Sequence, residues 1–92
     1  MIWAVKVKPK AAKQAEKLPG KIRDALLALI LEIRTEGPYR SNWPNYGWLK
    51  QSSCYHCHLK KGKPTYVALW TVDKKCVTVE VIYVGTHEKA PY

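Results

Sequence analysis

Acidic residues and long apolar segments are what this sequence most lacks. Seven Asp and Glu residues stand against sixteen Lys and Arg residues, so the 92-residue chain has a net charge of +9. The longest apolar run, Ala25 to Leu31, is too short for a membrane span, which requires about 20 residues. No charged segment followed by an apolar stretch lies at the N-terminus, and we expect no secretory signal. The charge excess predicts a partner that is a nucleic acid, an anionic lipid surface or an acidic protein.

Cysteines and glycine-rich loops are equally sparse. Three cysteines, an odd number, give no disulfide framework and predict free thiols in a reducing, cytoplasmic environment. Neither the G-x-G-x-x-G spacing nor the P-loop spacing occurs, which excludes the common phosphate-binding loops. The length predicts one domain over residues 1–92, with a single modest core.

The hydrophobic pattern predicts four strands and two helices. Residues 2–8 alternate between apolar and basic and indicate a strand that ends at Pro9. A short basic helix over 10–17 and a longer helix over 21–35 follow. The apolar residues of the longer helix recur at helical spacing: Ile22, Leu26, Leu29, Ile30 and Ile33. After a connection over 37–52, three more strands are predicted over 54–60, 64–72 and 76–84, with hairpin turns at 61–63 and 73–75.

The order of these elements is β-α-α-β-β-β. It predicts an α+β fold in which two helices pack on one face of a small, mainly antiparallel sheet. The first strand must return to the sheet across the helices, so we expect it to pair with one of the last three. The opposite face of the sheet is expected to be uncovered.

The strand over 54–60 places its residues alternately on the two faces. Tyr55, Cys57 and Leu59 form the apolar set, which we expect under the helices. His56, His58 and Lys60 share the other face with Cys54. Two imidazoles and an ammonium in a row are compatible with a solvated strand face or with a functional one, and the pattern alone leaves both open.

Zinc binding is the obvious rival interpretation of the cysteines and histidines in this strand. Zinc sites with the C-x2-C spacing lie on turns where both thiolates converge, whereas Cys54 and Cys57 in a strand point to opposite faces. Cys76 and His87 are isolated and supply no second ligand pair. No cysteine lies at a predicted helix N-terminus that would lower its pKa, which argues against a nucleophilic thiol. We therefore expect no metal and no other cofactor.

The C-terminal segment and the long connection carry further candidate residues. Gly85 is predicted to form a turn after the last strand, and the ionisable His87 follows it, with Tyr92 at the end of the chain. In the connection, Trp43, Tyr46 and Trp48 either fold the loop onto the sheet edge or stack on bases. Arg40 and Lys50, interleaved with these aromatic residues, would then contact phosphates.

Taken together, the order of elements and several short motifs resemble the RelE/ParE superfamily of bacterial type II toxin–antitoxin systems. The resemblance covers essentially the whole chain and is best over residues 54–61 and 84–92. Leu18-Pro19 between the helices and Gly37-Pro38 after the second helix are also similar to the family. Gly85-Thr86-His87 resembles the histidine-using members of the RelE branch, which cleave messenger RNA in the ribosomal A site.

The resemblance implies a set of site residues. The catalytic candidates are His87, His56, His58, Lys60 and Tyr92, and the RNA-binding candidates are Arg40, Lys50, Lys61, Lys63, Tyr66 and Trp48. Tyr66 stands where the family often has an arginine, and Tyr92 stands where it has a base-stacking aromatic residue. Histidine suits the proton transfers of RNA cleavage, since its unperturbed pKa of about 6.5 is near working pH.

The implied activity is that of a metal-independent endoribonuclease, an mRNA interferase that inhibits translation. His87 would act as general acid or base, with His56 or His58 as its complement, and Lys60 would stabilise the phosphorane. The implied partners are messenger RNA, the ribosome and a small acidic antitoxin that wraps the toxin as a helix or an added strand. Two alternatives are a non-catalytic inhibitor of DNA gyrase, as in the ParE branch, and an inactive basic nucleic-acid-binding domain.

Overall fold

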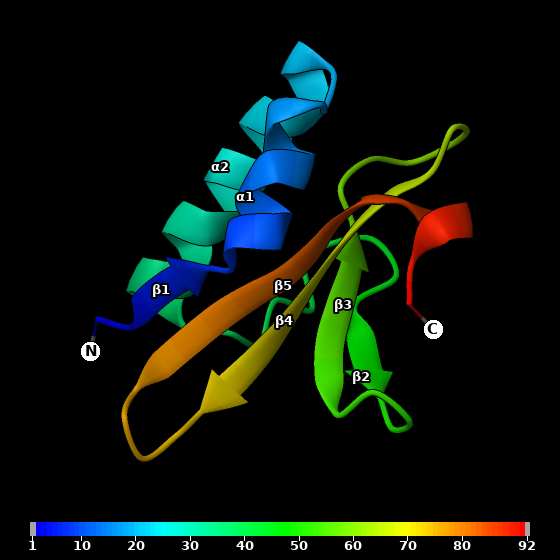
Figure 1. Ribbon diagram of the computed structural model, residues 1–92. Helices are drawn as coiled ribbons and strands as arrows, with labels where there is room; N and C mark the ends of the chain where they lie inside the picture. Colours follow the sequence, from blue (N-terminus) through cyan, green and yellow to red (C-terminus); the bar gives the residue numbers. More distant parts are fainter. Residues whose placement is uncertain (1, 92) are drawn as a thin grey trace.

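Two helices lie against one face of a five-stranded sheet in the computed structural model, which describes residues 2–91 (Figure 1). The strand order is β1-β5-β4-β3-β2; β1 pairs with β5 in parallel, and the other pairs are antiparallel. The predicted α+β fold and the return of β1 to one of the last three strands are both confirmed. The strands are β1 (Ala4–Val7), β2 (Gly47–Leu49), β3 (Cys54–His58), β4 (Tyr66–Asp73) and β5 (Thr78–Thr86).

The helices begin and end where the sequence indicates. Helix α1 (Pro9–Glu16) starts with a proline, whose fixed φ and missing N–H suit the first helical position. Helix α2 (Gly20–Glu36) ends at Gly37, which adopts a φ of 100° that other residues rarely reach. Neither helix is long and apolar enough to cross a membrane, within residues 2–91.

The main core lies between the helices and the sheet. Ile22, Leu26, Leu29 and Ile33 of α2 are buried there, as their spacing predicts, and Ile30 is half-buried. Each of the four buried side chains stabilises the fold by roughly 1.5–3 kcal/mol relative to an exposed position. They pack with Trp70 of β4, whose indole Nε1 donates to the carbonyl of Pro38 at 3.2 Å. Cys57 and Leu59 are buried in this core and Tyr55 packs against it, so the predicted alternation of β3 is confirmed.

The opposite face of the sheet is only partly open. Cys54, Val67, Leu69 and Tyr83 form a second, smaller buried cluster there. Leu49 of β2 and Ala90 of the C-terminal segment pack against this cluster, together with Ile82. The expectation of a bare face was wrong, because the long connection and the segment after β5 both return over it.

The connection over 37–52 contains a strand that the sequence analysis missed. Strand β2 is only three residues long, and its pairing with β3 joins Gly47 to His56 and Leu49 to Cys54. One side chain of α2 ties the connection down: Glu32 Oε1 accepts hydrogen bonds from Arg40, Asn42 and Trp43 at 3.0–3.2 Å. These donors, that of Asn42 first, hold the pKa of Glu32 below its usual range despite partial burial.

Candidate functional site

Three imidazoles gather on the sheet face that lies away from the helices. They are all the histidines of the chain, and we call them the histidine cluster: His56, His58 and His87. The ring centroids of His56 and His58 are 6.5 Å apart, and those of His58 and His87 are 5.8 Å apart. His58 therefore lies between the other two and contacts both. The structure brings together residues that are almost thirty positions apart in the sequence.

Backbone hydrogen bonds hold the three residues in place. His58 N donates to the carbonyl of Pro44 at 2.8 Å, which ties β3 to the long connection. His87 begins a single 3-10 turn, η1 (His87–Lys89), and its N–H donates to the carbonyl of Thr65, just before β4, at 2.8 Å. His56 Nδ1 lies 3.1 Å from the carbonyl of Gly47. Since a carbonyl only accepts, this contact selects the tautomer with the proton on Nδ1 and the acceptor lone pair on Nε2.

The cluster favours neutral imidazoles on β3. Burial lowers the pKa of His56, and the neighbouring His58 and His87 lower it further. Burial, followed by His87, also lowers the pKa of His58. A histidine with a lowered pKa is a neutral proton acceptor at pH 7, which is the form that a general base requires.

This pKa shift makes the stability of the fold depend on pH. Below the ordinary histidine pKa of about 6.5, the unfolded chain takes up protons at His56 and His58 that the folded chain resists. The folded state is therefore expected to lose stability as pH falls from about 7.5 to about 5.5, above the range where most carboxylates titrate. Thermal unfolding across this range measures the effect. The double variant His56→Asn, His58→Asn should have a flatter profile, and an equally steep profile would contradict the assignment.

Gly85 lies inside β5, opposite Val67, and the predicted turn at this position was wrong. A Cβ atom at Gly85 would lie 2.7 Å from the hydroxyl oxygen of Tyr83, since the Tyr83 ring covers this position. The Tyr83 hydroxyl donates to the carbonyl of Thr86 at 2.8 Å. The absent side chain thus makes room for a tyrosine that secures the end of β5, directly before His87.

Replacing Gly85 with alanine is expected to destabilise the protein by about 1–3 kcal/mol, as overpacking in a filled site does. Its φ of 158° adds to the strain. Gly20→Ala is the matched control, because a Cβ atom there meets nothing within 4 Å. Chemical denaturation of both variants measures the difference. Equal stability of the two would show that the Tyr83 ring does not need the space.

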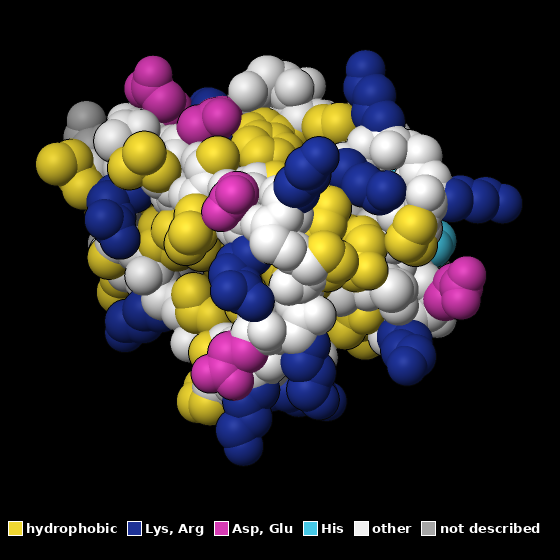
Figure 2. Space-filling model, turned by 90° about the horizontal axis from the view of Figure 1, so that it is seen from above, with side chains coloured by type: hydrophobic (Ala, Val, Ile, Leu, Met, Phe, Trp, Pro, Cys, Tyr) yellow, Lys and Arg dark blue, Asp and Glu magenta, His cyan; other side chains and the backbone are white. Residues whose placement is uncertain are grey.

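A groove beside the cluster supplies a place for a polyanion. It has a volume of about 530 Å³ and is lined by Lys63, Pro64, Thr65, Thr86, His87 and Glu88. Lys60, Lys61 and Lys63 lie on the β3–β4 turn next to it, where Lys60 Nζ donates to the carbonyl of Lys63 at 3.3 Å. Lys and Arg side chains are also spread over the rest of the visible surface (Figure 2).

Other predicted residues lie apart from the histidines. Tyr66 packs against the helix-side core, on the opposite face of β4 from Val67, and its RNA-binding role stays a prediction. Trp48 pairs with Tyr55 and packs edge-on against its ring at 4.8 Å, also on the helix side. Arg40 forms an ion pair with Glu32 at 3.2 Å, which neutralises the charge that was assigned to phosphate.

Lys50 and Tyr92 complete the set of sequence candidates. Lys50 is exposed in the turn after β2. Tyr92 lies outside the described residues, and its stacking role stays a prediction.

The cysteines do not converge on the histidines. Cys57 is buried under the helices and Cys54 on the opposite face, while Cys76 is exposed on the β4–β5 turn. Burial raises the pKa of Cys57 to about 12, which is the reverse of what a nucleophilic thiol needs. Among residues 2–91, no group of three or more His, Cys, Asp or Glu side chains has the arrangement of a metal site.

Tyr83, Thr65 and Thr86 shape the site and were missed by the sequence analysis. Tyr83 and Thr86 fall in or beside an apolar strand pattern, which gives no sign of a role in the site. Tyr66 pairs with Thr86, so the residue before β4 lies next to the residue after β5. Knowledge of this pairing could have indicated that Thr65 lies at the site. That pairing depends on the register of β4 and β5, which an irregularity between Leu69 and Trp70 shifts.

Comparison of the sequence alone matches no protein-family model and no curated protein. Solved structures do match. A mutant of the E. coli toxin RelE has a TM-score of 0.73 and 26% identity, over 98% of this chain and 88% of that chain. The RelBE2 toxin–antitoxin complex of Mycobacterium tuberculosis has a TM-score of 0.72 and 21% identity, over 95% of this chain and 100% of that chain. The RelE–RelB complex of Pyrococcus horikoshii gives 0.72 and 18%, over 98% and 100%. The shared fold over nearly the whole chain and the 26% identity to the E. coli protein support a RelE-family toxin.

Proposed function

We propose that this protein is the toxin of a toxin–antitoxin pair and that it acts as a metal-independent endoribonuclease on messenger RNA. The observation that carries the proposal is the histidine cluster. Every imidazole of the chain lies at one site, beside the lysine-rich turn at residues 60–63. General acid–base cleavage of RNA needs two proton carriers and a cation, and these residue types supply both.

The geometry favours His58 as the partner of His87. Their ring centroids are 5.8 Å apart, so both imidazoles reach the oxygens of one phosphate group. His58, with its lowered pKa, would take the proton from the 2′-hydroxyl. The 2′-oxygen then bonds to phosphorus, the bond from phosphorus to the 5′-oxygen breaks, and His87 gives that oxygen a proton. The products are a 2′,3′-cyclic phosphate and a 5′-hydroxyl.

The remaining residues would position the chain and balance its charge. His56 contacts His58 and would hold it in place through its own bond to Gly47. Lys60, Lys61 and Lys63 would neutralise the phosphates on either side of the cleaved bond. Tyr92 would stack on a neighbouring base. This selection leaves Tyr66, Trp48 and Arg40 outside the catalytic groove.

Messenger RNA on the ribosome is the proposed substrate, and a small acidic antitoxin is the proposed partner. The proposal of this substrate is based on the resemblance to the RelE branch and on the net charge of +9. The partner is supported by the M. tuberculosis structure, which is a toxin–antitoxin complex, and by the P. horikoshii RelE–RelB complex.

The test uses purified protein and translating ribosomes on a defined message. Primer extension should reveal discrete cuts, and the new 3′ ends should carry a cyclic phosphate. The same preparation is added to purified DNA gyrase in a supercoiling assay. Uncut message together with inhibited gyrase would refute the nuclease and favour the ParE-like alternative.

A further inference from the structure

Glu32 of α2 anchors the long connection between α2 and β3. Its Oε1 atom accepts hydrogen bonds from the side chains of Arg40, Asn42 and Trp43 at 3.0–3.2 Å. Arg40 is also its ion-pair partner, and only 15% of the Arg40 side chain is exposed. One carboxylate on the helix therefore fixes three side chains of the connection and balances a mostly buried charge.

The same connection contacts two members of the histidine cluster directly after these anchored positions. Pro44 follows Trp43, and its carbonyl accepts the N–H of His58 at 2.8 Å. The carbonyl of Gly47 lies 3.1 Å from His56 Nδ1. The approach is close, because a Cβ atom on Gly47 would lie 3.3 Å from Cε1 of the His56 ring. The backbone of the connection thus holds both His58 and the ring of His56.

The segment between the anchor and the histidines is short and internally bonded. The N–H of Trp43 donates to the carbonyl of Arg40 at 2.9 Å, and the N–H of Tyr46 donates to the carbonyl of Trp43 at 3.3 Å. The segment leads into β2, the edge strand of the sheet, which pairs with β3. A displacement that begins at the anchored side chains is therefore expected to reach the carbonyls of Pro44 and Gly47.

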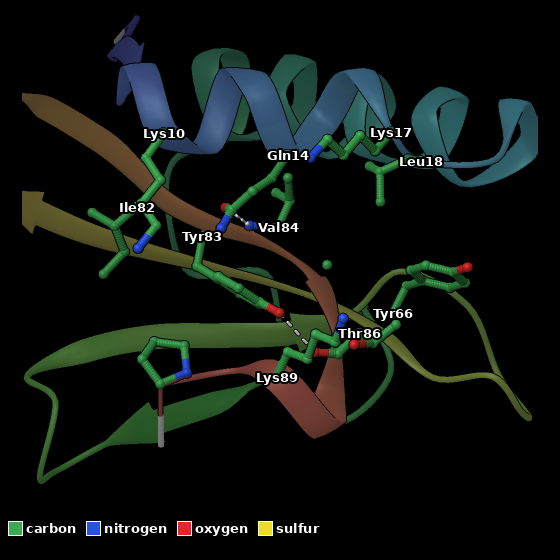
Figure 3. Close-up of a pocket in the computed structure, with 12 residues that line it drawn as sticks. Lys10, Gln14, Lys17, Leu18, Tyr66, Ile82, Tyr83, Val84, Thr86 and Lys89 are labelled. Atoms are coloured by element: carbon green, nitrogen blue, oxygen red, sulfur yellow. Dashed lines mark hydrogen bonds between the residues drawn. The ribbon is translucent and has the colours of Figure 1, made fainter.

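His87, the third member of the cluster, is held by separate contacts. Its N–H donates to the carbonyl of Thr65 at 2.8 Å. The Tyr83 hydroxyl donates to the carbonyl of Thr86 and secures the end of β5 just before it (Figure 3). These contacts lie at the ends of β4 and β5, apart from the connection over 37–52. The His87 amide is thus an internal reference for any change that begins at Glu32.

We propose that Glu32 is a positioning residue, which holds His56 and His58 in the arrangement with His87 that cleavage requires. The inference rests on the proposed nuclease function. Without the carboxylate, the mostly buried Arg40 guanidinium loses its counter-charge, and an unpaired buried charge is strongly unfavourable. The connection then shifts to hydrate the guanidinium, and the carbonyls that hold the two histidines shift with it. A misplacement of about 1 Å lowers a catalytic rate by roughly 10²-fold.

Cleavage kinetics test the effect on the reaction. Glu32→Ala is expected to lower the single-turnover rate on saturating programmed ribosomes by about 10- to 100-fold. Affinity for RNA should stay unchanged, because we assign it to the lysines of the β3–β4 turn. Glu32→Gln keeps an oxygen that accepts the bonds from Asn42 and Trp43, so it should recover part of the rate. Rates are compared where circular dichroism shows each variant to be folded.

Glu36→Ala is the matched control for these variants. It removes a carboxylate from the same helix and makes the same change in net charge, at an exposed position at the end of α2. It should cleave at the rate of the unmodified protein.

Hydrogen exchange resolved to single amides tests the structural link. In Glu32→Ala, exchange of the His58 amide should speed up by about tenfold or more, because its bond to Pro44 opens with the connection. The His87 amide should keep its exchange rate, since its bond goes to Thr65. A general loss of stability would instead accelerate both amides and would contradict the inference.

Asn42→Ala provides a milder variant in case Glu32→Ala does not fold. The Asn42 side chain is exposed and donates to the same carboxylate oxygen. Its removal should accelerate His58 exchange by about two- to tenfold, as expected for one hydrogen bond. The His87 amide should again keep its exchange rate.

Contrary results separate this inference from the proposed function. Unchanged His58 exchange in the Glu32 and Asn42 variants would overturn the inference and would leave the nuclease intact. Faster His58 exchange with an unchanged cleavage rate would also overturn it, because the connection would then not govern the reaction. If the unmodified protein leaves message uncut, the proposed function fails and the positioning role in cleavage fails with it. The exchange rates would then still decide whether Glu32 holds the histidines.

Discussion

His87→Ala is expected to lower the rate of message cleavage by about 10²- to 10⁴-fold, the usual contribution of a general acid or base. Growth arrest should disappear with the cleavage, since one site performs both. The substitution should change the free energy of unfolding by no more than about 0.5 kcal/mol, because the His87 side chain is exposed. Its backbone bond to Thr65 does not depend on the side chain. Single-turnover cleavage on programmed ribosomes measures the rate, and thermal unfolding measures the stability.

Three further variants serve as controls for His87. Glu36→Ala, on an exposed residue at the end of α2 and outside the groove, should keep its activity. The cleavage rate of His58→Ala should fall as far as that of His87→Ala, because the two imidazoles act on the same phosphate. The cleavage rate of His56→Ala should fall less, since we propose that His56 only holds His58 in place. A fully toxic His87 variant that leaves message uncut and still inhibits gyrase would refute the proposed reaction.

Affinity for RNA should fall about 20-fold between about 50 and 200 mM salt if three lysines contact phosphates of a single strand. The expected slope of log affinity against log salt is about −2, since each neutralised phosphate contributes about −0.7. The three lysines are Lys60, Lys61 and Lys63 of the β3–β4 turn. A steeper slope would indicate that cations outside this turn also contact phosphates.

Removing these lysines one at a time should reduce the slope by about 0.7 for each. The matched control is Lys74→Ala, Lys75→Ala, on the exposed turn between β4 and β5. Fluorescence anisotropy with a labelled single-stranded RNA gives both slopes. A slope that is unchanged in the lysine variants would remove the β3–β4 turn from the RNA-binding surface. A slope near zero in the unmodified protein would favour a partner that is not a nucleic acid.

The elements that depend on local sequence were predictable. Helix α2 follows from its apolar spacing, and the opposite faces of Cys54 and Cys57 follow from strand alternation. The same alternation placed His56 and His58 together. Such patterns repeat every few residues, so each is visible in a short window.

What depends on long-range pairing was not predictable from the pattern. Strand β2 has three residues and exists through its pairing with β3. Tyr66 packs against the helix-side core, and the face of β4 that meets the helices depends on where pairing with β5 begins. Gly85 was predicted as a turn, whereas its lack of a side chain serves the ring of Tyr83. The ion pair that neutralises Arg40 joins residues eight positions apart, and the sequence does not signal it.

The confinement of every histidine to one site has a spectroscopic consequence. In most proteins, imidazole proton signals from scattered surface histidines obscure those of the site of interest. Here the NMR spectrum should contain one imidazole Hε1 signal for each of the three histidines, and all of these belong to the cluster. Three single substitutions are enough to assign them. A titration of the unlabelled protein then follows the ionisation of coupled imidazoles directly, and the change in one curve when a neighbour is removed gives their interaction.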